Sequence, residues 1–351
     1  MSIKYNDVLG VTEEALLEEG VFNAFIDIDS SFHVDPHLLE SASTPELAGS
    51  YQRFRGYFNS LIKILEASKT EEDRFWREAK KRLHFKELPY VSLGYSKEGA
   101  SGRGIGNGLA SALVKTSAEI VEAGIKDPVI FELIGLFEEG IGADRISDMA
   151  LAIIIPDILS YSARVAKTLD VSTIEIPYGK KKINVPVNPD TNDPLILVPS
   201  EILSPLPVAY SWSDIDTVCS HNEELRNRLN TLIGETWGYA TKRVSKKDLK
   251  SAIMSNPEAL VDLIEQYKEK PADEYDFDSD PTGEFIWHRA GKEYAEKFPA
   301  DLSHFSLVED SNILPLVESI CEHFRDLVEN NGLVELLYDK DKPKNERALA
   351  K

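Results

Sequence analysis

The sequence predicts an α+β protein that is mostly helical, with a few short strands. Apolar residues recur at helical spacing over several long stretches, and a segment rich in proline and β-branched residues interrupts them after Asp170. We therefore expect two subdomains. Residues 1–170 form a mostly helical one with a glycine-rich loop, and residues 171–351 form a proline-rich strand segment followed by a helical subdomain.

Helical spacing is clearest from Pro45 to Ala67, where the apolar positions are Leu47, Tyr51, Phe54, Phe58, Leu61, Ile62 and Leu65. Further helices are expected over EEDRFWREAKKRLHF and over GLASALVKTSAEIVEAG, the latter ending at Gly124. Another begins at Asp127-Pro128. Helices resume from about Asp214 and continue, with interruptions, to the last one, which begins at NILPLVESICEHF.

Four segments read as strands or turns. VFNAFIDIDSSFHVDPHLL alternates apolar and polar residues and predicts a short strand or hairpin, and LPYVSLGYS predicts another strand. Tyr178-Gly179-Lys180 is expected to turn a hairpin. The run Ile196-Leu197-Val198, ahead of Pro199, is a candidate buried strand.

The charge balance favours protein partners over nucleic acid. Sixty acidic residues against 39 basic ones give a net charge of −21, which opposes the phosphate contacts that anchor DNA-binding proteins. The two cysteines form no CxxC or Cys/His cluster, as is typical of the reducing cytoplasm. The longest apolar run, MALAIIIPDIL, is short and should be broken by Pro156. We expect a cytoplasmic protein with a protein partner, no membrane contact and no direct DNA binding by this chain alone.

The stretch GLFEEGIGADRISDMALAIIIPDI places polar groups directly before an apolar run. Asp144 and Asp148 are four residues apart, so a helix puts both carboxylates on one face. Arg145 can pair with either, or bind a phosphate through its planar guanidinium group. Asp144, Arg145 and Asp148 are therefore candidate catalytic residues. The alternative is that Asp144 caps a buried helix whose turn is made by glycines.

Ligand-binding candidates come from the same corner and from a glycine-rich loop. GYSKEGASGRGIGNGLA lies between a predicted strand and a predicted helix, where backbone N–H groups can approach a phosphate. Its spacing matches neither GxxxxGK[ST] nor GxGxxG, so an ordinary surface loop is the competing interpretation. The candidates are Gly102, Gly104, Gly106, Glu139 and Ser147.

A divalent metal is a further possibility, with Asp35 and Asp148 as candidate ligands. His33, Asp35 and His37 alternate, so an extended chain places all three on one face. Pro36 argues instead for a helix that begins here with Asp35 as its cap. Glu78-Ala79-Lys80 has the letters of a nuclease motif, but it lies in a helical pattern where that chemistry needs a strand.

Several segments together resemble a family of bacterial phage-defence or restriction-type proteins. They are FIDIDSSFHVDPHLL, LGYSKEGASGRGIG, GLFEEGIGADRISDM, PLILVP, DFDSDPTGEFIW and KPKNERALA. The resemblance implies that family members continue past the equivalent of Lys351 into a restriction-endonuclease-like domain of the PD-(D/E)xK type, which would carry the nuclease chemistry. It assigns no catalytic residue to the part present here.

Three functions follow as hypotheses. The leading one is a non-catalytic sensing or scaffold module of a prokaryotic antiphage defence system, acting with a nuclease or other effector. The alternative is a metal- or phosphate-dependent hydrolase or nuclease that uses Asp144, Arg145 and Asp148. The third is an acidic inhibitor that mimics DNA, although the acidic residues are scattered over several predicted helices.

Overall fold

The computed structural model describes residues 3–26, 32–86, 88, 90–91, 93, 105–136, 138, 141–205, 250–251, 254, 257–269, 275, 277, 313–330, 338–339 and 342–343. The described residues form helices with a few short antiparallel strands, which confirms the predicted α+β class. The chain divides into two compact units, Met1–Gly283 and Glu284–Lys351. The expected subdomain boundary between residues 170 and 171 falls inside the first unit and stays a prediction.

The elements of the first unit are, in order, α1 (Tyr5–Leu9), α2 (Glu13–Glu18), β1 (Phe32–Val34), η1 (Leu38–Glu40), η2 (Pro45–Leu47), α3 (Ser50–Ala67), α4 (Arg74–Arg82), α5 (Asn107–Glu122), α6 (Ile130–Leu133), η3 (Ile134–Leu136), α7 (Ala143–Thr168), β2 (Thr173–Tyr178), β3 (Lys181–Pro186), η4 (Ser200–Ile202), β4 (Leu203–Pro205) and α12 (Pro257–Glu269). Those of the second unit are α14 (Ile313–Asn330), β5 (Tyr338–Asp339) and β6 (Lys342–Pro343).

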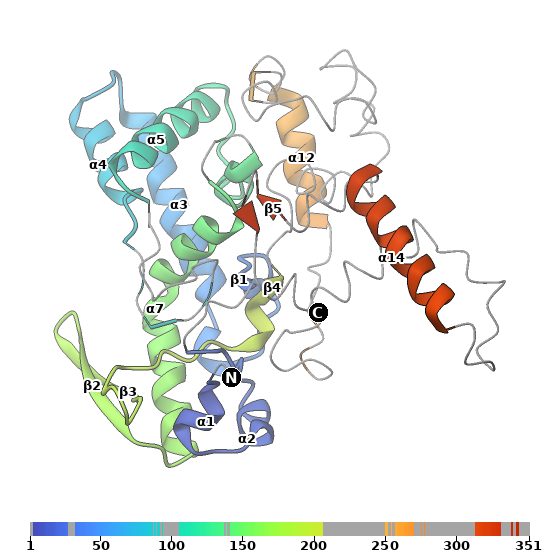
Figure 1. The fold of residues 1–351 in the computed structure, drawn as a ribbon. Helices are drawn as coiled ribbons and strands as arrows, with labels where there is room; N and C mark the ends of the chain where they lie inside the picture. The colour runs from blue at the N-terminus through green and yellow to red at the C-terminus, as the bar shows by residue number, and fades with distance from the viewer. Residues whose placement is uncertain are drawn as a thin grey trace. The chain divides into compact units, whose positions relative to one another are not determined.

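The core of the first unit is built on α3, α5 and α7, with α4 packed on α3 and α5 (Figure 1). Every apolar position predicted for the 45–67 segment is buried, which confirms the helical spacing. The segment is not one helix, however, because Gly49 has a φ of +94° and separates η2 from α3. Phe58 of α3 stacks on Phe131 of α6, with ring centroids 4.2 Å apart. These rings bring α6 onto the core.

The predicted helix end at Gly124 is confirmed, and α4 begins at a cap, Asp73, that was not predicted. Gly124 adopts a φ of +92°, the left-handed conformation that ends helices, directly after α5 and its C-cap. Asp73 caps α4 by accepting a 2.8 Å hydrogen bond from the backbone N–H of Trp76. Hydrogen bonds from the backbone N–H groups of Trp76 and Lys69 lower the pKa of the Asp73 carboxyl to about 2. The last turn of α4 carries Lys80, Lys81 and Arg82, whose positive charges interact favourably with the negative C-terminal end of the helix dipole.

The expectation that Pro156 breaks the apolar run is wrong, since α7 continues through it. Proline removes one helical hydrogen bond, but packing of α7 against α3, β1 and β3 outweighs that loss. By length and composition the part from Arg145 to Thr168 could cross a membrane, yet 67% of its most apolar window is buried within the protein. A core helix passes the same test.

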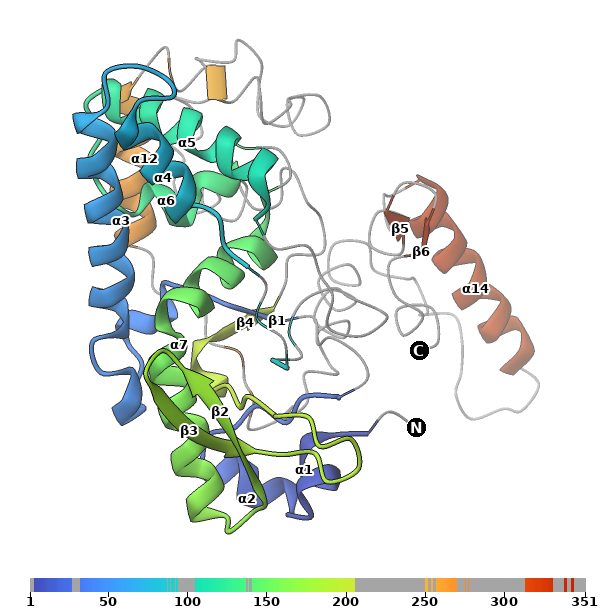
Figure 2. The ribbon, with the colours of Figure 1, turned by 90° about the vertical axis from the view of Figure 1, so that its left-hand side faces the viewer.

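The strands are short, and one pairing was not foreseeable locally. The short strand expected in VFNAFIDIDSSFHVDPHLL is present as β1, which pairs antiparallel with β4, with His33 opposite Ser204, while residues 27–31 lie outside the described residues. The predicted hairpin is confirmed as β2–β3, which turns at Gly179 with a φ of +59° and lies along α7 (Figure 2). Most of LPYVSLGYS lies outside the described residues.

Residues 196–198 are buried as expected, but they form no strand. The hydroxyl of Ser162 on α7 accepts from the Leu197 N–H at 3.0 Å and donates to the Leu197 carbonyl at 3.1 Å. A side chain thus satisfies backbone groups that a neighbouring strand would otherwise pair. Pro199 has no N–H to extend a ladder and makes only an isolated bridge with Val21.

Candidate functional site

The predicted corner forms the start of α7. The helix begins at Ala143 with Gly142 as its N-cap, so the expectation that Asp144 caps it is wrong. Gly142 is extended, and this places Asp144 inside the first turn instead. Positions 144 and 148 share one helix face, as expected from their spacing. Arg145 and Asp148 are half-exposed, and neither side chain is without interactions.

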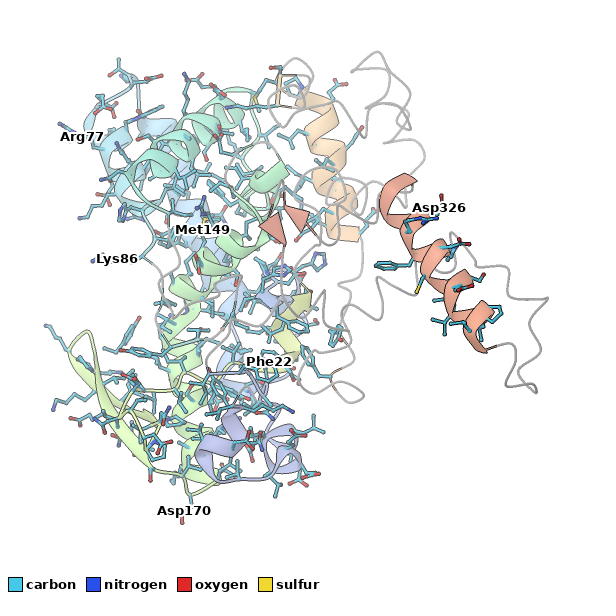
Figure 3. All side chains as sticks on the ribbon, viewed as in Figure 1. Phe22, Arg77, Lys86, Met149, Asp170 and Asp326 are labelled. Atoms are coloured by element: carbon cyan, nitrogen blue, oxygen red, sulfur yellow. The ribbon has the colours of Figure 1, made fainter. Side chains whose placement is uncertain are left out.

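Ser147 has a structural contact that explains its burial. Only 3% of the residue is exposed, and its Oγ accepts a 2.9 Å hydrogen bond from the backbone N–H of Val34. This bond ties the start of α7 to β1. Met149, two residues further along α7, is fully buried (Figure 3). The ligand-binding role predicted for Ser147 therefore competes with a role in holding β1.

The glycine-rich loop is only partly described. Gly106 is the N-cap of α5, which agrees with a loop that leads into a helix. Its φ of −76° suits any residue, and a Cβ added there meets nothing within 4 Å. Gly102, Gly104 and Glu139 lie outside the described residues. Their predicted roles stay predictions.

A buried carboxyl group, Glu132 of α6, lies at the centre of the most unusual polar cluster among the described residues. Glu132 is only 7% exposed, and the hydroxyl of Tyr267 on α12 donates to its Oε2 at 3.0 Å. Burial raises the pKa of Glu132 to about 8; the bond from Tyr267 opposes this rise, and the charge of Asp35 adds to it. Glu132 is therefore largely protonated at neutral pH.

Asp35 joins β1 to the same cluster. Its carboxylate accepts from the His37 N–H at 2.9 Å and from the Ser204 hydroxyl at 3.1 Å. The bond to a backbone N–H two residues on is the usual turn made by aspartate. Only the single turn η1 follows, with His37 at its cap position, so the expected helix is shorter and Asp35 is not its cap. The His37 ring meets the Tyr267 ring edge-on, with centroids 4.9 Å apart.

His33 supplies the second unusual polar atom. The residue is partly exposed, but its Nδ1 is shielded from solvent and has no hydrogen-bond partner. Burial of the ring lowers the pKa of His33, although the charge of Asp35 and a hydrogen bond to the Ser204 backbone oppose this. His33 is therefore neutral at neutral pH. If its other ring nitrogen donates to the Ser204 carbonyl, Nδ1 carries the lone pair.

Charged residues border the cluster on one side. Arg55 contacts Asp127 at 3.5 Å, and Lys268 of α12 contacts the same carboxylate at 2.6 Å. Burial opposes ionisation of Asp127, but hydrogen bonds from Lys268 and the Val129 N–H lower its pKa overall. Lys268 thus links α12, and Arg55 links α3, to the segment that leads into α6 (Figure 2). The positive charges nearest Glu132 are thus already engaged by a carboxylate.

Two shielded polar atoms of the cluster are available to bind a ligand. Glu132 Oε1 has no hydrogen-bond partner, and neither does His33 Nδ1. Such atoms are costly to leave unpaired, by about 1–3 kcal/mol each. The negative charge of Asp35 acts to raise the pKa of both groups. A molecule that hydrogen-bonds both would recover this cost.

The described residues contain no group of three or more His, Cys, Asp or Glu side chains placed to hold a metal ion. The sequence placed Asp35 beside His33, but Glu132 and Tyr267 were missed. A lone carboxylate inside the apolar run PVIFELIGLF was the available signal for Glu132. Tyr267 offered none, because its partner is 135 residues away.

The chain is a member of the family described as "Domain of unknown function (DUF8370)", which matches residues 10–211. A second family, "Domain of unknown function (DUF8371)", matches residues 313–351. No curated protein and no solved structure matches the chain. The first match includes Glu132, Asp35 and His33.

Proposed function

We propose that the chain is a non-catalytic sensing module of a prokaryotic antiphage defence system, which binds a small molecule at the Glu132 cluster and acts with a nuclease or other effector. The defence context rests on the sequence segments that resemble bacterial defence proteins. The sensing role rests on one observation: the shielded and unpartnered atoms Glu132 Oε1 and His33 Nδ1 beside Asp35.

The protonation states define the class of ligand. Protonated Glu132 accepts from Tyr267 through Oε2, which leaves Oε1 to carry the proton and donate. His33 Nδ1 is the matching acceptor. An anion is disfavoured, because Asp35 is close and the nearby cations pair with Asp127. These two groups therefore favour a small neutral molecule that carries a donor and an acceptor, as a nucleobase does.

Signal transfer has a direct route in the same contacts. Glu132 and His37 both contact Tyr267 of α12. A ligand that binds Glu132 would therefore change the contacts that hold α12. A sensor needs an element whose position depends on the ligand. α12 meets that need because polar contacts hold it, in addition to its buried Leu260, Leu263 and Ile264.

The test is native mass spectrometry of the chain purified from phage-infected and uninfected cells. We expect an additional small-molecule mass in the infected sample. Glu132→Met removes the unpaired oxygen at similar volume and should abolish that mass, whereas Glu122→Met, at an exposed position of α5, should keep it. Absence of any bound mass in wild-type protein, or its persistence in Glu132→Met, would refute the proposal.

Phage protection is the second readout. Cells that express the chain with its genomic neighbours should lose protection with Glu132→Met and keep it with Glu122→Met. Circular dichroism of the purified variants checks that both are folded. Protection that survives Glu132→Met would mean that the cluster only holds α12 in place.

A further inference from the structure

The second unit presents an apolar surface along α14. Four large apolar side chains on this helix are exposed: Leu314 (67%), Val317 (49%), Ile320 (47%) and Phe324 (52%). Cys321 is also exposed and is a free thiol. Figure 3 shows side chains on both sides of this helix up to Asp326. Exposed apolar residues that gather on one helix indicate an interaction surface.

The spacing of these residues indicates a helix as the partner. Leu314, Val317, Cys321 and Phe324 follow one another at intervals of three, four and three residues, the a and d positions of a heptad repeat. Ile320 flanks this seam at a g position. The half-exposed residues Leu316, Ser319 and His323 lie on a different side of the helix. The seam residues thus form an apolar strip among the exposed residues of α14.

The charged residues that flank the seam favour a second copy of the same helix, in antiparallel orientation, as the partner. In an antiparallel pair related by a two-fold axis, e positions lie beside e positions of the other copy. The e positions of α14 are Glu318 and Arg325, both exposed. Each Glu318 would therefore lie beside Arg325 of the other copy, twice per dimer. A parallel pair would place Ile320 beside Arg325 and form no such ion pair.

We propose that the chain forms a two-fold dimer in which α14 pairs antiparallel with α14 of a second copy. The match to the second family begins at Ile313, the first residue of α14, so the helix opens a region recognised as a family in its own right. The dimer is independent of the ligand proposed for the Glu132 cluster.

Sedimentation equilibrium of the full chain tests the dimer. We expect twice the 39.3 kDa mass of one chain at about 100 μM protein. Phe324→Glu should weaken dimerisation by at least about tenfold, because an apolar contact at the centre of the interface becomes a charge. Glu322→Gln, at an outward b position, is the matched control and should leave it unchanged. Val317→Glu repeats the test should Phe324→Glu fold poorly.

Charge reversal tests the orientation. Glu318→Arg or Arg325→Glu alone should weaken the dimer severalfold, since each places like charges together at both ends. The double variant Glu318→Arg/Arg325→Glu should restore it. A monomeric wild-type chain, or a dimer indifferent to both Phe324→Glu and Val317→Glu, would overturn the proposal. Failure of the double variant to restore association would overturn the antiparallel arrangement.

Discussion

The hydroxyl of Tyr267 donates a 3.0 Å hydrogen bond to Oε2 of Glu132, across 135 residues of sequence. The bond joins α12 to α6 at a point where Glu132 is only 7% exposed. It leaves the other carboxyl oxygen of Glu132 without a partner. This contact therefore attaches a helix and partly offsets the rise in the pKa of Glu132 that burial causes.

Glu132 should make stability fall as pH rises. Its pKa is about 8 in the folded protein against an ordinary value of 4.5, so folding binds a proton between these values. The stabilisation is complete below the unfolded value and is lost as pH rises through the folded one. Glu132→Gln stays neutral and should match wild type in acid, yet exceed it by a few kcal/mol above about pH 8. Urea denaturation across this range measures the difference.

The comparison with Glu132→Gln is needed because other ionisable groups make the free energy of unfolding rise, rather than fall, with pH. The pKa values of Asp73, Asp127 and Glu201 are lowered in the folded protein, so their contributions are lost in acid. Subtracting the variant's curve from that of wild type isolates Glu132. A difference that does not change with pH would show that Glu132 is ionised in the folded state like an exposed carboxyl.

Tyr267→Phe should destabilise the first unit. The variant removes the donor to a buried oxygen of Glu132, and an unpaired buried acceptor costs about 1–3 kcal/mol. Because the bond from Tyr267 opposes the rise, the pKa of Glu132 should also move further upward. Tyr178→Phe, at a half-exposed hairpin residue, is the control and should change little. Equal unfolding free energies for the two variants would contradict the role assigned to Tyr267.

The sequence predicted what local periodicity controls. The α3 positions were readable because Phe54, Phe58 and Leu61 recur on one face and are all buried. Gly124 and Gly179 were readable because each adopts a positive φ in a turn. In these cases the residues that define the element are neighbours in the chain.

What escaped prediction depends on distant segments. β1 pairs with β4, which lies far along the chain, so no local pattern could reveal that His33 lies opposite Ser204. Glu132 was overlooked because its pKa depends on burial and on Tyr267, which folding alone brings near. Pro156 was misjudged for the same reason, because tertiary packing along α7 outweighs a local helix breaker.

Asp148→Ala separates the sensing proposal from the hydrolase alternative. We expect purified wild-type chain to leave nucleic acid intact in Mg²⁺ or Mn²⁺, and the variant to behave alike with a Tm within a few degrees, about 1 kcal/mol. Asp148 is half-exposed near the start of α7, so its removal leaves no cavity. Nuclease activity in wild type that disappears in a folded Asp148→Ala variant would instead establish the corner as an active site.

Ser147→Ala tests whether the same corner is structural. Its Oγ accepts a 2.9 Å hydrogen bond from the buried Val34 N–H. The variant leaves this N–H without an acceptor and should lose about 1–3 kcal/mol of unfolding free energy. Ser160→Ala provides a control on the same helix, because that exposed hydroxyl only donates to the Pro156 carbonyl. It should change stability by less than about 0.5 kcal/mol. If both variants unfold like wild type, Ser147 does not hold β1, and its hydroxyl becomes the better candidate for binding a ligand.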